Sequence, residues 1–242
     1  MAHIENPDSQ LTAVKWRFPS VHPEGRKYVL IAAAIALLVY WAISPFLGWL
    51  LIGVTIWVAA FFRDPIRTTP VSPRLIVSPA DGLVTMITRV PAPPELRTQL
   101  GEGEFTRVSI FMSVFDVHIN RSPIAGFVRR IAYVPGKFLN ADLDKASEDN
   151  ERQHFVVESP DGLKIGFTQI AGLVARRILS FVAEGDRVTA GERIGLIRFG
   201  SRVDVFLPAG TGSRLLLGQR AIAGETVVAE LGVDPGLSGA SQ

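Results

Sequence analysis

The chain contains no cysteine and little histidine, and these shortages exclude several kinds of chemistry. Without cysteine it has no disulfide, no thiol nucleophile and no cysteine-ligated zinc. The histidines are His3, His22, His118 and His154, and because two of them lie near the N-terminus we expect no metal site. The formal net charge of +2 is small for 242 residues, so no nucleic-acid partner is expected.

Charge is also missing from one long apolar block near the N-terminus. No residue from Tyr28 to Phe62 is charged. A single straight helix of this length would measure about 52 Å, too long for a hydrocarbon core of about 30 Å. Ser44 and Pro45, near the middle, favour a turn. We therefore expect a membrane-associated helical hairpin over residues 28–62, inserted fully or partly.

Basic residues flank this block on both sides, which favours a cytoplasmic location for both ends. They are Lys15, Arg17, Arg26 and Lys27 before the block, and Arg63, Arg67 and Arg74 after it. The block starts too late and is too long for a signal peptide. The alternative is a buried hairpin in a soluble protein, which the rest of this small chain could hardly cover. The expected location is the cytoplasmic face of the cell membrane.

Beyond residue 70 the pattern changes to short apolar segments separated by glycine, proline and aspartate, which predicts a mainly β domain with few short helices. We expect strands at 75–77, 83–90, 108–115, 127–134, 155–158, 164–170, 178–182, 194–198, 203–207, 214–217 and 226–231, and a short helix at 138–146. The predicted organisation is a polar N-terminal tail over 1–27, the hairpin over 28–62, a β domain over 63–233 and a disordered tail over 234–242.

Two turn-like segments of the β domain repeat one another. Residues 185–192 read Gly-Asp-Arg-Val-Thr-Ala-Gly-Glu, and residues 218–225 read Gly-Gln-Arg-Ala-Ile-Ala-Gly-Glu. Glycine supplies the positive φ that tight turns require, so each segment is expected to form a hairpin turn between strands. The pattern also resembles the turns of biotinyl and lipoyl domains, which suggests a barrel-sandwich arrangement of two small sheets.

Four segments carry polar residues in an order that resembles one known family. They are 78–82 (Ser-Pro-Ala-Asp-Gly), 111–123 (Phe-Met-Ser-Val-Phe-Asp-Val-His-Ile-Asn-Arg-Ser-Pro), 150–153 (Asn-Glu-Arg-Gln) and 198–208 (Arg-Phe-Gly-Ser-Arg-Val-Asp-Val-Phe-Leu-Pro). Together, after an apolar N-terminal block, they resemble the pyruvoyl-dependent phosphatidylserine decarboxylase proenzymes in their short bacterial form. No single motif is decisive, whereas the ordered set is quite specific.

The resemblance implies a reaction at Gly200 and Ser201. In the family, the serine attacks the preceding carbonyl, an N-to-O acyl shift gives an ester, and β-elimination and hydrolysis leave a pyruvoyl group. A large chain 1–200 and a small chain 201–242 would result. The pyruvoyl ketone would act as an electron sink for the decarboxylation of phosphatidylserine to phosphatidylethanolamine. A Gly-Ser pair alone is usually a turn, as Gly212-Ser213 illustrates, but the first pair lies between two strand-like segments.

A base is needed to activate the serine hydroxyl, and Asp81 and His118 are the candidates. On spacing alone, Asp81 would be an ordinary turn aspartate and His118 a structural histidine. The resemblance instead places Asp81 in a self-cleavage triad with a histidine, and His118 near the substrate carboxylate. Longer family members carry a second histidine where this chain has Arg121. Either His118 acts alone, or Asp81 acts through water; Arg121 is a surface charge, or it pairs with a phosphate or the substrate carboxylate.

A further stretch, Asn150, Glu151 and Arg152, is similar to one in the family. The resemblance implies that this stretch and His154 order the substrate pocket, with a solvated loop as the alternative. The implied partners are a phospholipid substrate and the membrane, and a homodimer is left open.

The strongest alternative of a different class is a membrane-anchored, lipoyl-like binding module, followed by a structural membrane protein. A carrier module would need a lysine at a hairpin tip, since function must be argued from such a site. The lysines, at positions 15, 27, 137, 145 and 164, lie in neither repeated turn. Within the enzyme class, the alternative is a decarboxylase of serine lipids with ether-linked chains.

Overall fold

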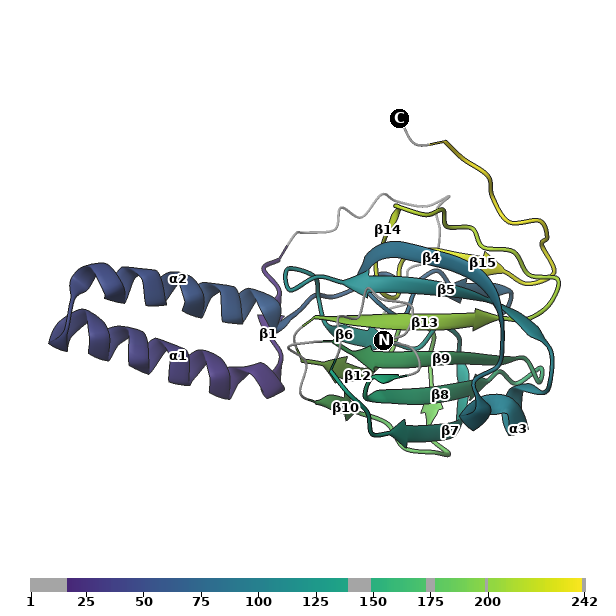
Figure 1. The fold of residues 1–242 in the computed structure, drawn as a ribbon, viewed down its shortest axis with the longest axis horizontal. Coiled ribbons are helices and arrows are strands. Elements are labelled where there is room, and N and C mark those ends of the chain that lie inside the picture. The colour runs from purple at the N-terminus through teal and green to yellow at the C-terminus, as the bar shows by residue number, and fades with distance from the viewer. Residues whose placement is uncertain (1–16, 139–148, 173–176, 199, 241–242) are drawn as a thin grey trace, which may run out of the picture.

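The computed structural model describes residues 17–138, 149–172, 177–198 and 200–240. A hairpin of two helices projects from one end of a β domain (Figure 1). The β domain is formed by a curled eight-stranded sheet and smaller sheets that pack against it. The fold is mainly β with an N-terminal apolar helical hairpin, as the sequence predicted.

The hairpin consists of α1 (Pro23–Ala42) and α2 (Pro45–Phe61). A proline begins each helix, where a backbone N–H would have no helical partner. The turn falls at Ile43 and Ser44, as expected from the sequence. By length and composition α1 could cross a membrane, whereas α2 has 17 residues and is shorter. Large apolar side chains of both helices, such as Trp41 and Phe46, are exposed, which is the kind of surface that a hydrocarbon environment would cover.

The strands and remaining helices follow in chain order. They are β1 (Ser20–Val21), β2 (Arg63–Asp64), β3 (Leu75–Val77), β4 (Gly82–Pro91), the 3-10 helix η1 (Pro94–Leu96), α3 (Arg97–Leu100), β5 (Glu104–Met112), β6 (Ile119–Arg121), β7 (Gly126–Val134), β8 (Arg152–Glu158), β9 (Lys164–Ala171), β10 (Ile178–Ser180), β11 (Arg187–Val188), β12 (Arg193–Ile197), β13 (Ser201–Leu207), β14 (Arg220–Ala221) and β15 (Val227–Glu230). The large antiparallel sheet has the order β11-β7-β8-β9-β13-β5-β4-β14. The smaller sheets are β10-β12-β6, β15-β3 and β1-β2, the last of which joins the two ends of the hairpin.

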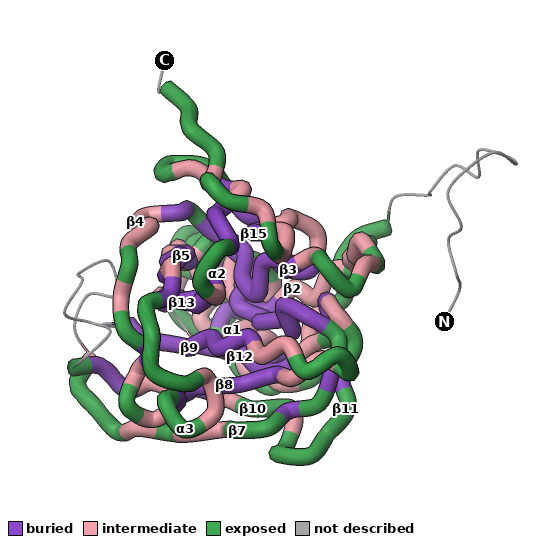
Figure 2. Tube along the Cα trace, turned by 90° about the vertical axis from the view of Figure 1, so that its right-hand side faces the viewer, coloured by how far each residue is buried: buried purple, intermediate pink, exposed green. Residues whose placement is uncertain are grey.

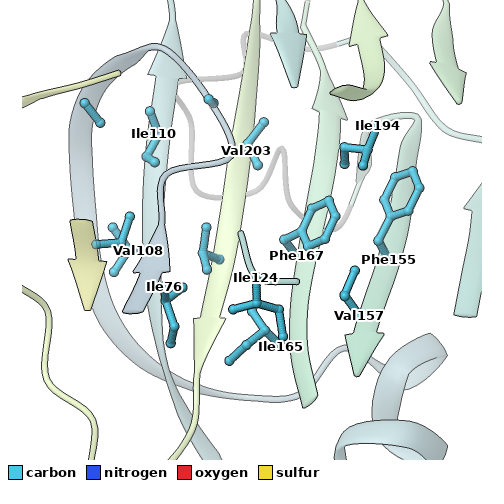
Figure 3. Packing of buried hydrophobic residues seen from close by; sticks show 14 of the residues in the cluster. Ile76, Val108, Ile110, Ile124, Phe155, Val157, Ile165, Phe167, Ile194 and Val203 are labelled. Atoms are coloured by element: carbon cyan, nitrogen blue, oxygen red, sulfur yellow. The ribbon is translucent and has the colours of Figure 1, made fainter. Parts of the chain in front are cut away.

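One hydrophobic core lies between the large sheet and the smaller sheets. Phe155 of β8 and Phe167 of β9 stack with ring centroids 5.0 Å apart (Figure 3). Val203 of β13 lies in the same core, and Ile76 of β3 and Ile194 of β12 complete it from the smaller sheets. The buried segments gather in the centre of the β domain and the exposed ones form its rim (Figure 2). Packing two sheet faces on one core gives the barrel-sandwich arrangement.

The β domain contains an approximate twofold repeat that relates residues 78–86 to residues 122–130. Both segments begin with Ser-Pro, and in each the serine Oγ donates to the carbonyl two residues later at 2.7 Å. Each then enters a long strand that has a bulge at the equivalent position. The halves also exchange hydrogen bonds, since the N–H groups of Val77 and Arg121 donate to the carbonyls of Pro123 and Pro79, both at 2.9 Å.

The repeated segments 185–192 and 218–225 occupy equivalent places in the two halves. The N–H groups of Gly185 and Gly218 donate to the carbonyls of Val128 and Val84, both at 2.8 Å. Both glycines have positive φ, as expected. The expected hairpin is confirmed for residues 185–192, which lie between the paired antiparallel strands β10 and β12. It is wrong for residues 218–225, because the strands β13 and β15 on either side of them belong to different sheets. Each segment contains a two-residue strand, β11 or β14, that pairs with the distant strand β7 or β4.

Most of the strand predictions are confirmed, with small shifts at the ends, and two fail for a local reason. The strand predicted at 108–115 ends at Met112, because Ser113 and Asp116 form a turn closed by the Asp116 carboxylate. The strand predicted at 214–217 is a turn, because the Ser213 hydroxyl bonds to both the N–H and the carbonyl of Leu215. The helix predicted at 138–146 falls almost entirely outside the described residues.

Candidate functional site

Gly200 and Ser201 lie at the start of β13, in the middle of the large sheet. Ser201 pairs with Met112 of β5 on one side and with Ala171 of β9 on the other, and it is fully buried. Gly200 has φ of 61°, in the left-handed region that favours glycine, and a Cβ at this position would meet no atom within 4 Å. Glycine suits this backbone conformation, and it leaves the carbonyl that the serine would attack without a neighbouring side chain from residue 200.

The second Gly-Ser pair differs from the first in how its hydroxyl is used. Ser213 Oγ donates to the Leu215 carbonyl at 2.9 Å and accepts from the Leu215 N–H at 3.0 Å. Ser201 Oγ instead lies 3.4 Å from the Met112 sulfur, which is a weak acceptor. The hydroxyl of Ser201 is thus less committed to structure than that of Ser213, which fits a nucleophile.

His118 lies beside Gly200. Its Nε2 accepts a hydrogen bond from the Gly200 N–H at 3.2 Å, and its Nδ1 lies 3.0 Å from the Asp116 carbonyl oxygen. Because a carbonyl oxygen only accepts, Nδ1 carries the proton and Nε2 presents its lone pair. The ring is fully buried, and this burial lowers the pKa of His118 to about 4. At neutral pH the unprotonated Nε2 therefore accepts from the Gly200 N–H, one residue away from Ser201. In the part of the chain that the structure describes, no hydrogen bond joins His118 to the Ser201 hydroxyl, whose contact is with the Met112 sulfur.

The helical hairpin forms one wall of this histidine site. The Phe61 ring, at the end of α2, lies 4.3 Å from the His118 ring, centroid to centroid. Phe61 and Phe62 are buried in a small cluster with Val117 and Leu196. The hairpin is consequently part of the site as well as a projection from the β domain, and its removal up to residue 62 would uncover His118.

Asp81 lies between β3 and β4 and is tied to other groups. Its Oδ2 bonds to Arg67 Nη2 at 2.6 Å, and its Oδ1 accepts from the Ala223 N–H at 2.8 Å. Burial raises the pKa of the Asp81 carboxyl, and it outweighs the opposing effects of Arg67 and the Ala223 N–H. Among the described residues, no hydrogen bond joins Asp81 to His118 or to Ser201. The suggested triad is therefore not assembled by direct contacts.

The internal repeat shows that the fold does not need an aspartate at this position. Asp81 corresponds to Ala125 in the second half, between the same Ser-Pro and the same glycine. The turn forms in both halves, with the same serine hydrogen bond. The Asp81 carboxylate therefore does more than close its turn, because it joins Arg67 to the Ala223 N–H.

The prediction that Arg121 is a surface charge is wrong. Its side chain is buried because β6 lies inside the domain, and burial lowers the pKa of the guanidinium to about 10. Nη1 donates to the Gly191 carbonyl at 2.7 Å and Nη2 to the Pro65 carbonyl at 3.0 Å. The guanidinium thus joins a turn of the second half to the segment that follows the hairpin.

The stretch Asn150–His154 is not a solvated loop, because most of it is buried. Asn150 Nδ2 donates to the Ala171 carbonyl at 2.7 Å, next to Ser201 across the ladder, and the Glu151 carbonyl accepts from the Ala171 N–H at 2.9 Å. Arg152 Nη2 lies 3.3 Å from Glu95. These residues support the strand beside Ser201.

His154 lies on the other face of the sheet from Ser201. Cross-strand partners share a face of the sheet, and His154 pairs with Thr168, which pairs with Asp204. Ser201 lies an odd number of residues from Asp204 in β13, so its side chain is on the opposite face, the core face that also carries Val203. His154 Nδ1 lies 2.8 Å from Thr168 Oγ1. The structure therefore does not bring His154 to the cleavage site.

Two polar contacts near the site were not predicted from the sequence. Gln169 Nε2 donates to Asn120 Oδ1 at 2.7 Å, and Asn120 also lies against the Met112 sulfur. Arg198, two residues before Gly200, bonds to Glu24 of α1 at 3.0 Å and lies over the Tyr28 ring. Asn120 belongs to a motif quoted above, but no local pattern could indicate a contact between residues as distant as Glu24 and Arg198.

Comparison with known proteins agrees with this geometry. The family model described as phosphatidylserine decarboxylase matches residues 54–229. The chain is 61% identical to a protein of Novosphingobium aromaticivorans over 94% of the chain and 93% of that protein, and 58% identical to one of Erythrobacter litoralis over 94% of each. A protein of Zymomonas mobilis is 56% identical over 94% of each. All three are named phosphatidylserine decarboxylase proenzyme. The chain belongs to the phosphatidylserine decarboxylase family.

Membership of the phosphatidylserine decarboxylase family confirms the resemblance inferred from the four motifs. The family match begins inside α2 and ends inside β15, so it contains Asp81, His118, Gly200 and Ser201. The word proenzyme in the names of the relatives denotes a chain that matures by processing. Within the described residues, no group of three or more histidine, aspartate or glutamate side chains is placed to hold a metal ion.

The buried histidines of this family member predict acid lability. Burial lowers the pKa of His118 to about 4 and also lowers the pKa of His154, so the unfolded chain binds these protons more readily. Stability is fully present above pH 6.5 and falls as the pH drops towards 4, by about 3 kcal/mol for His118 alone. Asp81, whose pKa is raised, acts weakly in the opposite direction.

The apparent Tm of the detergent-solubilised protein should therefore fall between pH 7 and pH 5, and His154→Gln should reduce the slope. A Tm that stays constant over this interval would show that the histidines are not buried in the neutral form.

Proposed function

We propose that the chain cleaves itself between Gly200 and Ser201 and then decarboxylates phosphatidylserine at the membrane, using a pyruvoyl group derived from Ser201. The observation that carries the proposal is the hydrogen bond between His118 Nε2 and the Gly200 N–H. It holds an unprotonated imidazole nitrogen next to a serine whose hydroxyl has only a weak partner. Family membership favours this enzyme over the binding module considered above.

The cleavage step uses groups that belong to the chain. His118 would take the proton of the Ser201 hydroxyl as its oxygen attacks the Gly200 carbonyl carbon. The peptide nitrogen leaves that carbon and becomes the amine of Ser201, which gives an ester. Loss of the Ser201 α-proton then expels the Gly200 carboxylate, and hydrolysis of the resulting enamine releases ammonia. The chains 1–200 and 201–242 remain.

The sheet topology would keep the two chains together after the cut. The small chain begins with β13, which lies between β9 and β5 of the large chain and pairs with both along most of its length. The residues of β13 are all buried. On the other side of the cut, Glu24 and Tyr28 would hold Arg198, close to the new C-terminus at Gly200. Cleavage therefore need not disturb the fold.

The surroundings of residue 201 fit a pyruvoyl group. Because the Ser201 hydroxyl has only a weak contact with the Met112 sulfur, its conversion into a carbonyl would break no strong hydrogen bond. Such a carbonyl, once formed, would accept the substrate amine and withdraw electrons from the carbon that loses CO₂. His118 Nε2, fixed by the Asp116 carbonyl at Nδ1, would hold the proton that replaces the carboxylate. Phe61 and the surrounding apolar side chains would limit the access of water.

The helical hairpin supplies the reason for a lipid substrate. Its apolar side chains are exposed on both helices, and its last residues reach His118. Inserted in the cytoplasmic face of the cell membrane, the hairpin would hold the site at the level where phospholipid headgroups lie. Phosphatidylserine combines the amine and carboxylate that the carbonyl chemistry needs with a lipid anchor.

The test is intact-mass analysis combined with an activity assay. Purified active protein should consist of one chain ending at Gly200 and one beginning with a blocked N-terminus at position 201. It should release labelled CO₂ from carboxyl-labelled phosphatidylserine in mixed micelles without added pyridoxal phosphate or metal, and phenylhydrazine should inhibit it by capturing the carbonyl. Activity from an uncut chain, or a fully cut chain without turnover, would overturn the proposal.

A further inference from the structure

The loop between β5 and β6, residues 113–118, presents an aromatic side chain at the root of the hairpin. Phe115 is 71% exposed. Its carbonyl accepts a hydrogen bond from Arg63 Nη2 at 2.9 Å, and Arg63 Nη1 donates to the carbonyl of Ala60 in α2 at 2.7 Å. One guanidinium therefore ties the loop to the last turn of the hairpin.

This loop is held in one conformation by its own hydrogen bonds. Asp116 Oδ2 accepts from the Ser113 N–H at 2.9 Å and from the Ser113 hydroxyl at 2.7 Å, and Arg220 holds the other carboxylate oxygen. A single exposed apolar side chain is ordinary on a protein surface. Phe115 differs from such a side chain, because its loop is constrained and is tied to the apolar hairpin. The position of its ring along the hairpin axis is therefore fixed.

The charge around the hairpin root is positive. Arg26 and Lys27 are exposed in the first two turns of α1. The nearby acidic groups are matched by arginines: Glu24 by Arg198, Asp64 by Arg193 and Asp116 by Arg220. The net charge at the root of the hairpin is therefore positive, and it complements the negative charge of the anionic phospholipids in a cytoplasmic leaflet.

We propose that these residues, Arg26, Lys27, Arg63 and Phe115, form a docking surface that lies in the headgroup layer of an anionic bilayer, with the Phe115 ring inserted below the phosphates. The inference rests on the proposed membrane-bound decarboxylase and adds a second contact with the lipid besides the hairpin. Phe115 precedes Asp116 and lies three residues before His118 in the chain. Docking would therefore hold the loop that carries the catalytic histidine against the surface from which the substrate headgroup enters.

The absence of cysteine allows a direct test with single labels on the full-length protein. Phe115→Cys would carry an environment-sensitive nitrobenzoxadiazole dye, and Asp161→Cys would carry the same dye in the exposed turn between β8 and β9, at the opposite ends of these strands from the cleavage site. In vesicles of phosphatidylglycerol and phosphatidylcholine, the dye at 115 should shift to the blue and be quenched by lipids spin-labelled near the headgroup. The dye at 161 should do neither, and the response at 115 should weaken in vesicles of phosphatidylcholine alone.

The outcomes separate this inference from the proposed function. Protein that floats with vesicles while the dye at 115 reports water would overturn the docking surface and leave the hairpin anchor intact. Protein that fails to float would contradict the anchor itself. A blue shift without quenching by spin-labelled lipid would place a second copy of the chain on Phe115 and would also overturn the inference.

A kinetic comparison tests whether docking matters for turnover. For Phe115→Ser, the ratio of turnover on phosphatidylserine in bilayers to turnover on a water-soluble short-chain phosphatidylserine should fall about ten-fold, the value expected for losing one buried aromatic ring. Phe127→Ser, at the other end of the β domain, is the matched control and should keep the wild-type ratio. Equal ratios for both variants would remove any role of Phe115 in reaching the bilayer.

Discussion

Ser201→Ala should yield a single uncut chain of 242 residues with no decarboxylase activity above background. Removing the hydroxyl removes the proposed nucleophile, and alanine cannot eliminate to give a ketone precursor. The loss should be complete, because both the cut and the carbonyl depend on the same oxygen. Intact-mass spectrometry and release of labelled CO₂ measure the two consequences separately.

Ser213→Ala provides the matched control, because Gly212-Ser213-Arg214 repeats the local sequence Gly200-Ser201-Arg202. The Ser213 hydroxyl stabilises a turn at Leu215, so its loss should lower stability by about 1 kcal/mol and leave cleavage intact. A Ser201→Ala protein that still separates into two chains, or a Ser213→Ala protein that folds but remains uncut, would contradict the assignment of the cleavage site.

The hairpin and most strands could be predicted because their signals are local. The uncharged run and Ser44-Pro45 are sufficient to predict two helices and a turn, and the alternation at the start of β7 indicates a strand directly. β6 was missed because Ile119, Asn120 and Arg121 form a short and polar strand that is buried by distant parts of the chain. Local side-chain hydrogen bonds ended or replaced strands at Ser113 and Ser213, which periodicity does not register.

The site was predictable to a different extent for each residue. Ser201 was identified through its strand context and the family resemblance, and Asp81 and His118 through their motifs. The contact of Phe61 with His118 and that of Glu24 with Arg198 could not be predicted, because they join the hairpin to residues far along the chain. The face of His154 could not be predicted either, because it depends on the register of β8 with β9 and of β9 with β13.

His118→Ala should slow self-cleavage by at least about a hundred-fold, the usual contribution of a general base. The reason is that Nε2 is the unprotonated nitrogen beside Gly200. Because burial lowers the pKa of His118 to about 4, the wild-type cleavage rate should stay nearly constant from pH 8 down to about 5. An exposed histidine acting as the base would instead lose activity around pH 6.5. The rate is measured from the decay of the uncut chain on denaturing gels after synthesis in a cell-free system.

His154→Gln is the control for this variant, because it removes another buried histidine whose pKa is also lowered, but on the opposite face of the sheet. It should cut at close to the wild-type rate. A second measurement tells whether the same ring also serves decarboxylation. The small cut fraction of His118→Ala is isolated, its carbonyl groups are counted by titration with phenylhydrazine, and decarboxylation is expressed per carbonyl group. Wild-type cleavage by His118→Ala would transfer the role of base to Asp81 acting through water, and a block in His154→Gln would show that the face of the sheet does not decide which histidine acts.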